Sequence, residues 1–162
     1  MATRRHHSGW IIVVSFVVAL LLSIVIMPAW TALFRPDWAA MVLIYWCMAL
    51  PHRVNVGYGW LVGLCVDVLS GALLGQHALG FAVIAYLAVK LHQRLRIFPV
   101  WQQALSVTVL VALEQLLVLW VQGMIGLAHE SWTYWLPSIV SGLLWPWTFL
   151  LLRRLRRRFR VS

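Results

Sequence analysis

The stretch LPHRVNVGYGWLVGLCVDVLSGALLGQHAL, residues 50–79, decides how the chain folds. A small or polar residue recurs in it at every fourth position, and on a helix of 3.6 residues per turn this spacing makes one slowly drifting stripe. The members of the stripe are Asn55, Gly59, Gly63, Asp67, Gly71 and Gly75. Missing side chains let the backbone of a neighbouring helix approach closely. The stretch therefore predicts a packing helix at the centre of a helical bundle.

Gly59 and Gly63 also form a GxxxG pattern, which occurs at the interfaces of membrane helix dimers. The same pattern serves packing between helices of one chain. We favour packing within the chain, and self-association stays open.

The composition of the chain is typical of a membrane protein. Of its 162 residues, 63% are hydrophobic and 10% are charged, and the mean hydropathy is +0.88. Soluble domains have about 45–50% apolar and about 25% charged residues. The net charge of +9 would suggest nucleic-acid binding in a soluble protein, but this chain has too little polar surface for a water-exposed basic face. We therefore expect no nucleic-acid partner.

Six apolar stretches are candidates for membrane-spanning helices, because one span needs about 20 apolar residues. They cover residues 10–27, 37–50, 54–74, 78–91, 104–127 and 135–152. The sequence predicts one all-α transmembrane domain over residues 1–162, a six-helix bundle with a basic tail at 153–162. The second and fourth stretches reach only about 20 Å, short of a hydrocarbon core of about 30 Å. We expect them to borrow flanking residues, thin the bilayer or be shielded by neighbouring helices.

The distribution of positive charge sets the predicted orientation. With six spans and a cytoplasmic N-terminus, Arg35 lies outside and the other 12 of the 13 Lys and Arg residues lie inside. This asymmetry follows the positive-inside rule. Both termini are therefore predicted to be cytoplasmic, in a multi-pass protein.

Two acidic residues fall at membrane depth, Asp67 and Glu114. A carboxylate there costs several kcal/mol unless it is protonated, paired or facing water, so each must face the protein interior or a cavity. Ser70, Gln115 and Gln122 are available as hydrogen-bond partners. We favour a structural role for both acids, and contact with a ligand or a partner is the alternative.

No arrangement of residues points to catalysis. The sequence has no GxSxG elbow, P-loop, GxGxxG fingerprint or HExxH site, and no His, Cys or carboxylate cluster has metal-ligand spacing. We therefore expect no enzymatic activity, no catalytic residue, no metal site and no cofactor.

The last apolar stretch and the tail carry further candidates for contact. Pro146 between Trp145 and Trp147 should kink the helix, and an aromatic-rich bend could pack within the bundle or face a partner. The tail continues this helix, and its arginines can lie on anionic phospholipids of the inner leaflet or act only as an orientation signal. They are Arg153, Arg154, Arg156, Arg157, Arg158 and Arg160.

Over nearly its whole length the chain resembles the MreD family of rod shape-determining proteins of Gram-negative bacteria. The most specific segments are FRPDW (34–38), YWCMALPHRVNVGYG (45–59), DVLSGALLGQHAL (67–79), VWQQAL (100–105) and GLLWPWTFLLLRRLR (142–156). The glycine and acidic positions typical of the family fall on Gly63, Asp67, Gly71 and Gly75.

The resemblance implies a small inner-membrane protein of the cell-elongation machinery, whose bundle is similar to the S component of energy-coupling-factor transporters. It also implies binding to MreC, which has one membrane helix, in a complex with MreB, RodA and a class B penicillin-binding protein. Our first hypothesis is a non-catalytic scaffold that helps organise peptidoglycan synthesis and maintain rod shape. The alternative is a small-molecule or lipid-binding transporter subunit with a cavity lined by Asp67, Glu114 or His77.

Overall fold

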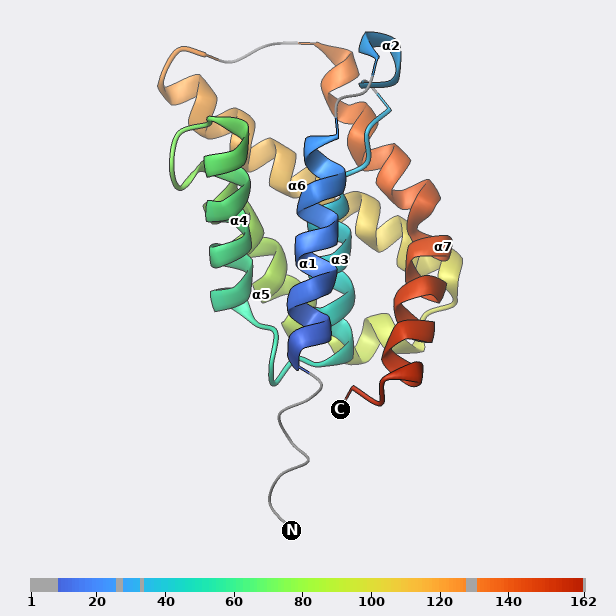
Figure 1. Cartoon of the computed structure of the whole chain (residues 1–162). Coiled ribbons are helices and arrows are strands. Elements are labelled where there is room, and N and C mark those ends of the chain that lie inside the picture. The colour runs from blue at the N-terminus through green and yellow to red at the C-terminus, as the bar shows by residue number, and fades with distance from the viewer. Residues whose placement is uncertain (1–8, 26–27, 33, 128–130, 162) are drawn as a thin grey trace.

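The computed structural model describes residues 9–25, 28–32, 34–127 and 131–161. Within these ranges the chain forms seven α-helices, one short 3₁₀ helix and no β-strand, so the predicted all-α fold is confirmed. The long helices pack into one bundle, with a single-turn helix at one end (Figure 1). The elements are α1 (Gly9–Ile24), α2 (Ala29–Ala32), α3 (Trp38–Ala49), α4 (Val56–Ser70), α5 (Gln76–Ile97), α6 (Val100–Met124), η1 (Trp132–Trp135) and α7 (Leu136–Arg158).

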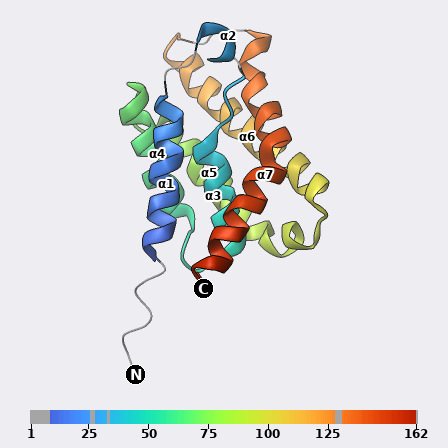
Figure 2. The same ribbon diagram turned by 45° about the vertical axis from the view of Figure 1, so that its right-hand side comes forward.

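The central helix of the bundle is α3, and not α4 as the glycine stripe predicted. Helix α3 contacts each of the other five long helices, and Figures 1 and 2 show it between α1 and α7. Every residue from Ala39 to Ala49 is buried. The helix has only 12 residues, about 18 Å at 1.5 Å per residue. The neighbouring helices therefore enclose this short helix.

Polar contacts fix α3 between its neighbours. At its start, the Asp37 carboxylate accepts a hydrogen bond from Ala40 N at 3.1 Å, and Asp37 N donates to Ser141 Oγ of α7 at 2.9 Å. In its middle, the fully buried Trp46 donates from Nε1 to Ser15 Oγ of α1 at 2.8 Å. These bonds satisfy groups that would otherwise be costly to bury.

Each of the six predicted stretches coincides with one long helix, but several boundaries differ. Helix α5 continues beyond residue 91 through charged residues to Ile97 and ends before Pro99, because the residue preceding a proline disfavours the helical conformation. Pro99 then precedes α6, which begins at Val100 instead of residue 104. The apolar runs underestimate the lengths of both helices, because each run ends where hydropathy changes and the helix continues beyond that point. Residues 26–27 of the first stretch lie outside the described residues.

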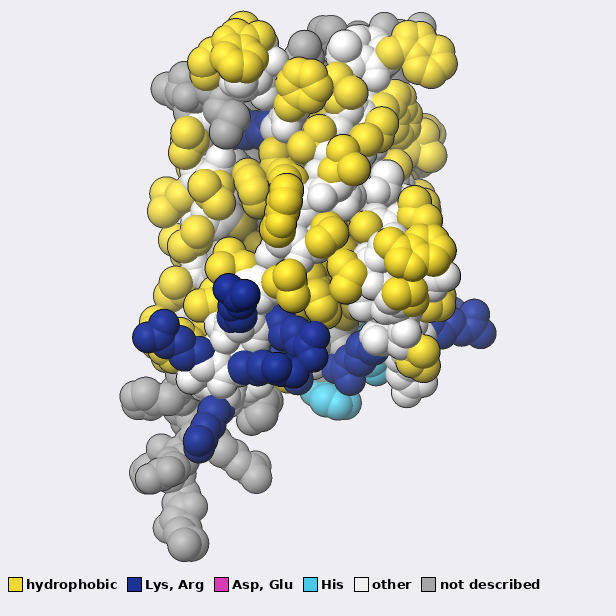
Figure 3. All heavy atoms as spheres, turned by 90° about the vertical axis from the view of Figure 1, so that its right-hand side faces the viewer, with side chains coloured by type: hydrophobic (Ala, Val, Ile, Leu, Met, Phe, Trp, Pro, Cys, Tyr) yellow, Lys and Arg dark blue, Asp and Glu magenta, His cyan; other side chains and the backbone are white. Residues whose placement is uncertain are grey.

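The two ends of the bundle differ in charge. The first turn of α1 lies beside the end of α7, where the rings of Trp10 and Phe159 are 5.9 Å apart. Figure 3 shows Lys and Arg side chains gathered at one end of the molecule, below a face that is mostly hydrophobic. Arg4 and Arg5, two of the residues predicted to lie on the cytoplasmic side, are outside the described residues.

By length and composition, two helical segments could each cross a membrane, Val100–Met124 and Trp132–Arg158. Three further apolar helices are shorter, namely α1, α3 and α4. On α1 and α4 many large apolar side chains are exposed, such as Val68 at 68% and Leu61 at 56%, both on α4.

Candidate functional site

The glycine stripe brings α4 and α5 into close contact. A Cβ atom on Gly59 would lie 2.6 Å from Phe81 O, and one on Gly63 would lie 2.6 Å from Ala78 N. Real Cβ atoms do not approach backbone atoms so closely, so only glycine fits at these two positions. Packing within the chain, which we favoured for the GxxxG pattern, is therefore what the structure has.

The stripe does not continue along one helix to its last members. Helix α4 ends at Ser70, and not at residue 74. Gly71 and Gly75 lie in the turn before α5, with φ angles of +66° and +99°. A positive φ favours glycine, which has no Cβ to clash with the backbone. These two glycines therefore shape the turn, and Asn55 caps the start of α4 by accepting a hydrogen bond from Gly57 N at 3.1 Å.

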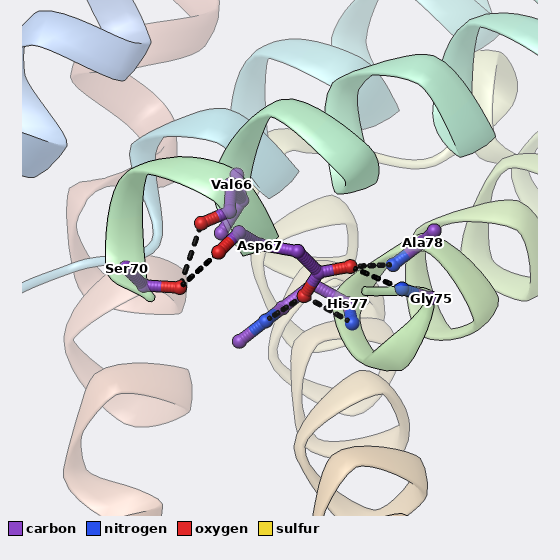
Figure 4. Close-up of polar contacts among 6 residues, drawn as sticks. All are labelled: Val66, Asp67, Ser70, Gly75, His77 and Ala78. Atoms are coloured by element: carbon purple, nitrogen blue, oxygen red, sulfur yellow. Dashed lines mark hydrogen bonds and ion pairs between the residues drawn. The ribbon is translucent and has the colours of Figure 1, made fainter. Parts of the chain in front are cut away.

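Asp67 is the centre of a polar cluster at the α4–α5 turn, which Figure 4 shows. Its carboxylate is fully buried. Oδ2 accepts a hydrogen bond from Gly75 N at 2.9 Å, and Oδ1 accepts one from His77 N at 2.9 Å. Oδ1 also lies 2.8 Å from His77 Nδ1, as an ion pair when the imidazole is protonated. We call Asp67, Gly75 and His77 the turn cluster.

The turn cluster supplies a cap for the start of α5. The first N–H groups of a helix have no partner within it, and a side chain usually caps them. The residue at the cap position here is Gly75, which has no side chain to do so. The carboxylate of Asp67 on α4 supplies the missing acceptor, and its negative charge is favourable at a helix N-terminus.

The predicted partners of the two acids are not the observed ones. Ser70 Oγ donates to the carbonyl of Val66 at 2.7 Å, within its own helix. Gln115 pairs with η1, because its Nε2 donates to Tyr134 O at 3.0 Å and Tyr134 Oη donates to Gln115 O at 3.0 Å. Sequence reasoning placed His77 only in a cavity and missed it as the partner of Asp67. His77 lies two residues after Gly75, at the start of α5, and this position was the only feature of the sequence that pointed to the pairing.

Glu114 differs from Asp67 in having no bonding partner for one of its oxygens. The side chain is buried on α6, with Oε1 unpaired in the described part of the chain. It lies against α5, where a Cβ on Gly80 would come 2.9 Å from Glu114 Cγ. Glu114 therefore does not join the turn cluster by hydrogen bonding. Among the described residues, no group of three His, Cys, Asp or Glu side chains could hold a metal ion.

The two tryptophans that flank Pro146 face opposite ways. Trp145 is fully buried and donates from Nε1 to Gln103 Oε1 at 3.4 Å. Trp147 is 70% exposed. Helix α7 runs through Pro146 without interruption and continues to Arg158. Trp145 is thus a packing residue, and Trp147 belongs to the outer surface.

Besides a depression next to Trp38 and Trp147, two hollows lie beside α7. The first is a groove between α1 and α7 with a volume of about 300 Å³, which we call the α1–α7 groove. Its lining is almost wholly apolar and includes Val14, Val18, Leu22, Leu151 and Leu155. The second is a smaller pocket at the basic end of the bundle, described below. The residues of the turn cluster line neither of them.

A helical bundle with an apolar outer surface, a charged end and a buried acid tied to a helix terminus has the features of the helical membrane proteins. A family model described as rod shape-determining protein MreD matches residues 4–155. The rod shape-determining protein MreD of Haemophilus influenzae is 36% identical to the chain over 161 residues, which cover 99% of each protein. The chain therefore belongs to the MreD family of membrane proteins.

The comparison with solved structures gives no match. The similarity to the S component of energy-coupling-factor transporters therefore stays a prediction.

Proposed function

We propose that the chain is a non-catalytic scaffold of the cell-elongation machinery, which binds MreC and helps organise peptidoglycan synthesis to maintain rod shape. The observation that carries the proposal is the match to MreD proteins over nearly the whole chain. The turn cluster agrees with a structural role for Asp67, because its carboxylate accepts hydrogen bonds from the chain itself. MreB, RodA and a class B penicillin-binding protein are the further partners in this proposal.

The proposal includes a topology of six spans in the inner membrane, with both termini in the cytoplasm. Three observations support it. Six long helices coincide with the six apolar stretches, the short α3 is enclosed by the others, and Lys and Arg side chains gather at one end (Figure 3). That end is then the cytoplasmic one.

The α1–α7 groove is the proposed docking site for the membrane helix of MreC. Its lining residues Val14, Val18 and Leu22 are spaced four apart on α1, so they form one ridge along the helix. These three side chains are between 39% and 48% exposed, so about half of each is open to a partner. An apolar helix laid against this ridge would pack into the groove without exposing polar groups.

Filling the groove should weaken the complex with MreC. We expect Val18→Trp to reduce co-purified MreC about tenfold, because a forced fit of this kind costs about 1–3 kcal/mol and 1.4 kcal/mol is a factor of ten. The measurement is quantitative co-purification of tagged protein from detergent-solubilised membranes. Val109→Trp is the matched control, since Val109 is 66% exposed on α6 and does not line the groove. Equal recovery of MreC with both variants would place the partner elsewhere.

Complementation tests the scaffold function itself. In rod-shaped cells depleted of their own MreD protein, expression of this chain should restore rod shape, measured as the ratio of cell length to width. Depleted cells that stayed rod-shaped, with the synthesis complex still assembled, would rule the proposal out.

The alternative of a small-molecule or lipid-binding transporter subunit rests on an internal cavity lined by Asp67, Glu114 or His77. The hollows beside α7 are lined by other residues, and no observation favours the alternative over the scaffold. Ligand-dependent thermal stabilisation that is lost in Glu114→Gln would reverse this preference.

A further inference from the structure

A pocket of about 230 Å³ opens at the basic end of the bundle, where α3, α5, α6 and α7 meet. We call it the arginine pocket, because three guanidinium groups from two helices converge on it. Its lining consists of Tyr45, Met48, Ala49, Arg96, Gln103, Phe149, Arg153 and Arg156. None of these residues is acidic, so the pocket carries three positive charges with no carboxylate among its described walls.

The walls of the pocket are held in place by the fold. Arg96 of α5 donates from Nε to Met48 O at 2.7 Å and from Nη2 to Ala49 O at 2.6 Å. These are carbonyl groups of the last turn of α3, which have no partner within that helix. A guanidinium has five N–H groups in a fixed planar arrangement, and these two bonds use two of them. Arg96 is therefore oriented by α3 while other N–H groups remain for a further acceptor.

The second wall is equally well defined. Gln103 is buried, and its Nε2 donates to Leu95 O at 2.8 Å. On α7, the Arg153 guanidinium lies over the ring of Phe149, 6.0 Å from its centroid. The Phe149 ring in turn meets the ring of Tyr45 edge-on at 5.8 Å. Two aromatic rings in mutual contact therefore line the pocket beside its arginines.

Three guanidinium groups at one pocket attract an anion, and two of them, Arg96 and Arg153, are exposed to an incoming ligand. Arginine is suited to bind phosphate, because its planar N–H groups donate in pairs to two phosphate oxygens. The size of the pocket restricts the ligand further. Sites that enclose whole small molecules measure about 300–1,000 Å³, so this pocket of about 230 Å³ has room for a headgroup but not for an attached chain.

We propose that the arginine pocket binds the phosphate of an anionic phospholipid, with the acyl chains lying outside the pocket. This proposal rests on the proposed membrane topology in one respect, namely that the lipid belongs to the cytoplasmic leaflet. Binding in this pocket is different from a general contact between the arginine-rich tail and lipid. Arg96 and Arg153 belong to a pocket built by several helices, and not to one exposed helical surface.

The test is thermal unfolding of the full chain, purified in detergent, with added short-chain phosphatidylglycerol. Short-chain phosphatidylcholine and inorganic phosphate are the comparison ligands. We expect phosphatidylglycerol to stabilise the protein most, and the double variant Arg153→Gln/Arg156→Gln to weaken its apparent binding about tenfold or more. Arg157→Gln/Arg158→Gln is the matched control, because it removes the same charge from the same helix outside the pocket.

Each outcome decides for or against the pocket. A preference for phosphatidylglycerol that is lost in the pocket variant and kept in the control supports the proposal. Equal weakening in both double variants would mean that only net charge matters, and the proposal would fail. Equal stabilisation by inorganic phosphate would rule out the lipid as the ligand. None of these readouts depends on cell shape, so they are distinct from the test of the scaffold.

Discussion

Gly63→Leu is expected to prevent the chain from folding into a stable bundle. A Cβ at this position would lie 2.6 Å from Ala78 N and 2.8 Å from His77 C. These are backbone atoms of α5, so the contact cannot be relieved by turning a side chain. Overpacking usually costs about 1–3 kcal/mol, and we expect a loss at or above the upper end of that range.

The damage at Gly63 should extend to the turn cluster. Moving the backbone of His77 and Ala78 away from α4 also moves the N–H of His77, which lies 2.9 Å from Asp67 Oδ1. The variant therefore loses helix packing and the cap of α5 together. The measurement is the fraction of monodisperse protein after purification in detergent, followed by the midpoint of thermal unfolding.

Two further variants separate this effect from a general effect of size. Gly63→Ala should also destabilise the protein, because the clash begins at Cβ. Gly123→Leu is the matched control, since a Cβ at Gly123 meets no atom within 4 Å. If Gly63→Leu and Gly123→Leu gave the same thermal midpoint, the close approach of α4 to α5 would be wrong.

The sequence predicts the helices of this protein well, because an apolar run at membrane depth can form only one kind of element. The helix ends are harder to predict. Hydropathy changes at residue 91, whereas α5 ends at Ile97, because the proline at position 99 and not the charge of Arg94 or Arg96 ends the helix. The central position of α3 was also missed, since its neighbours are fixed by contacts between distant parts of the chain.

Part of the candidate site could likewise be predicted from the sequence, and part could not. Spacing on one helix predicts that Gly59, Gly63 and Asp67 share a face, and they do so against α5. Spacing gives no information across a turn, so the pairing of Asp67 with His77 was not predicted. The arginine pocket was missed for the same reason, because Arg96 and Arg153 are brought together only by the packing of α5 and α7 against α3.

Asp67→Leu is expected to destabilise the protein by several kcal/mol. The change leaves the N–H groups of Gly75 and His77 without their acceptor, and it leaves the His77 imidazole without its partner. A buried group left without its hydrogen bond costs about 1–3 kcal/mol, and more when charge is involved. The side chain is fully buried, so this loss is one of folding and not of direct contact with MreC.

A cycle of variants at Asp67 and His77 measures how the cost is divided. His77→Ala should cost less than Asp67→Leu, because the carboxylate keeps its bonds to the backbone N–H groups of residues 75, 77 and 78. The double variant should be little worse than Asp67→Leu alone, since the pair no longer exists once either member is gone. Ser70→Ala is the control, because Ser70 donates only to carbonyls of α4.

Thermal midpoints in detergent give the free-energy differences, and co-purification with MreC distinguishes a role of Asp67 in folding from a role in partner contact. An Asp67→Leu protein that is as stable as the parent but has lost MreC would assign the carboxylate to the partner and contradict its role as the cap of α5.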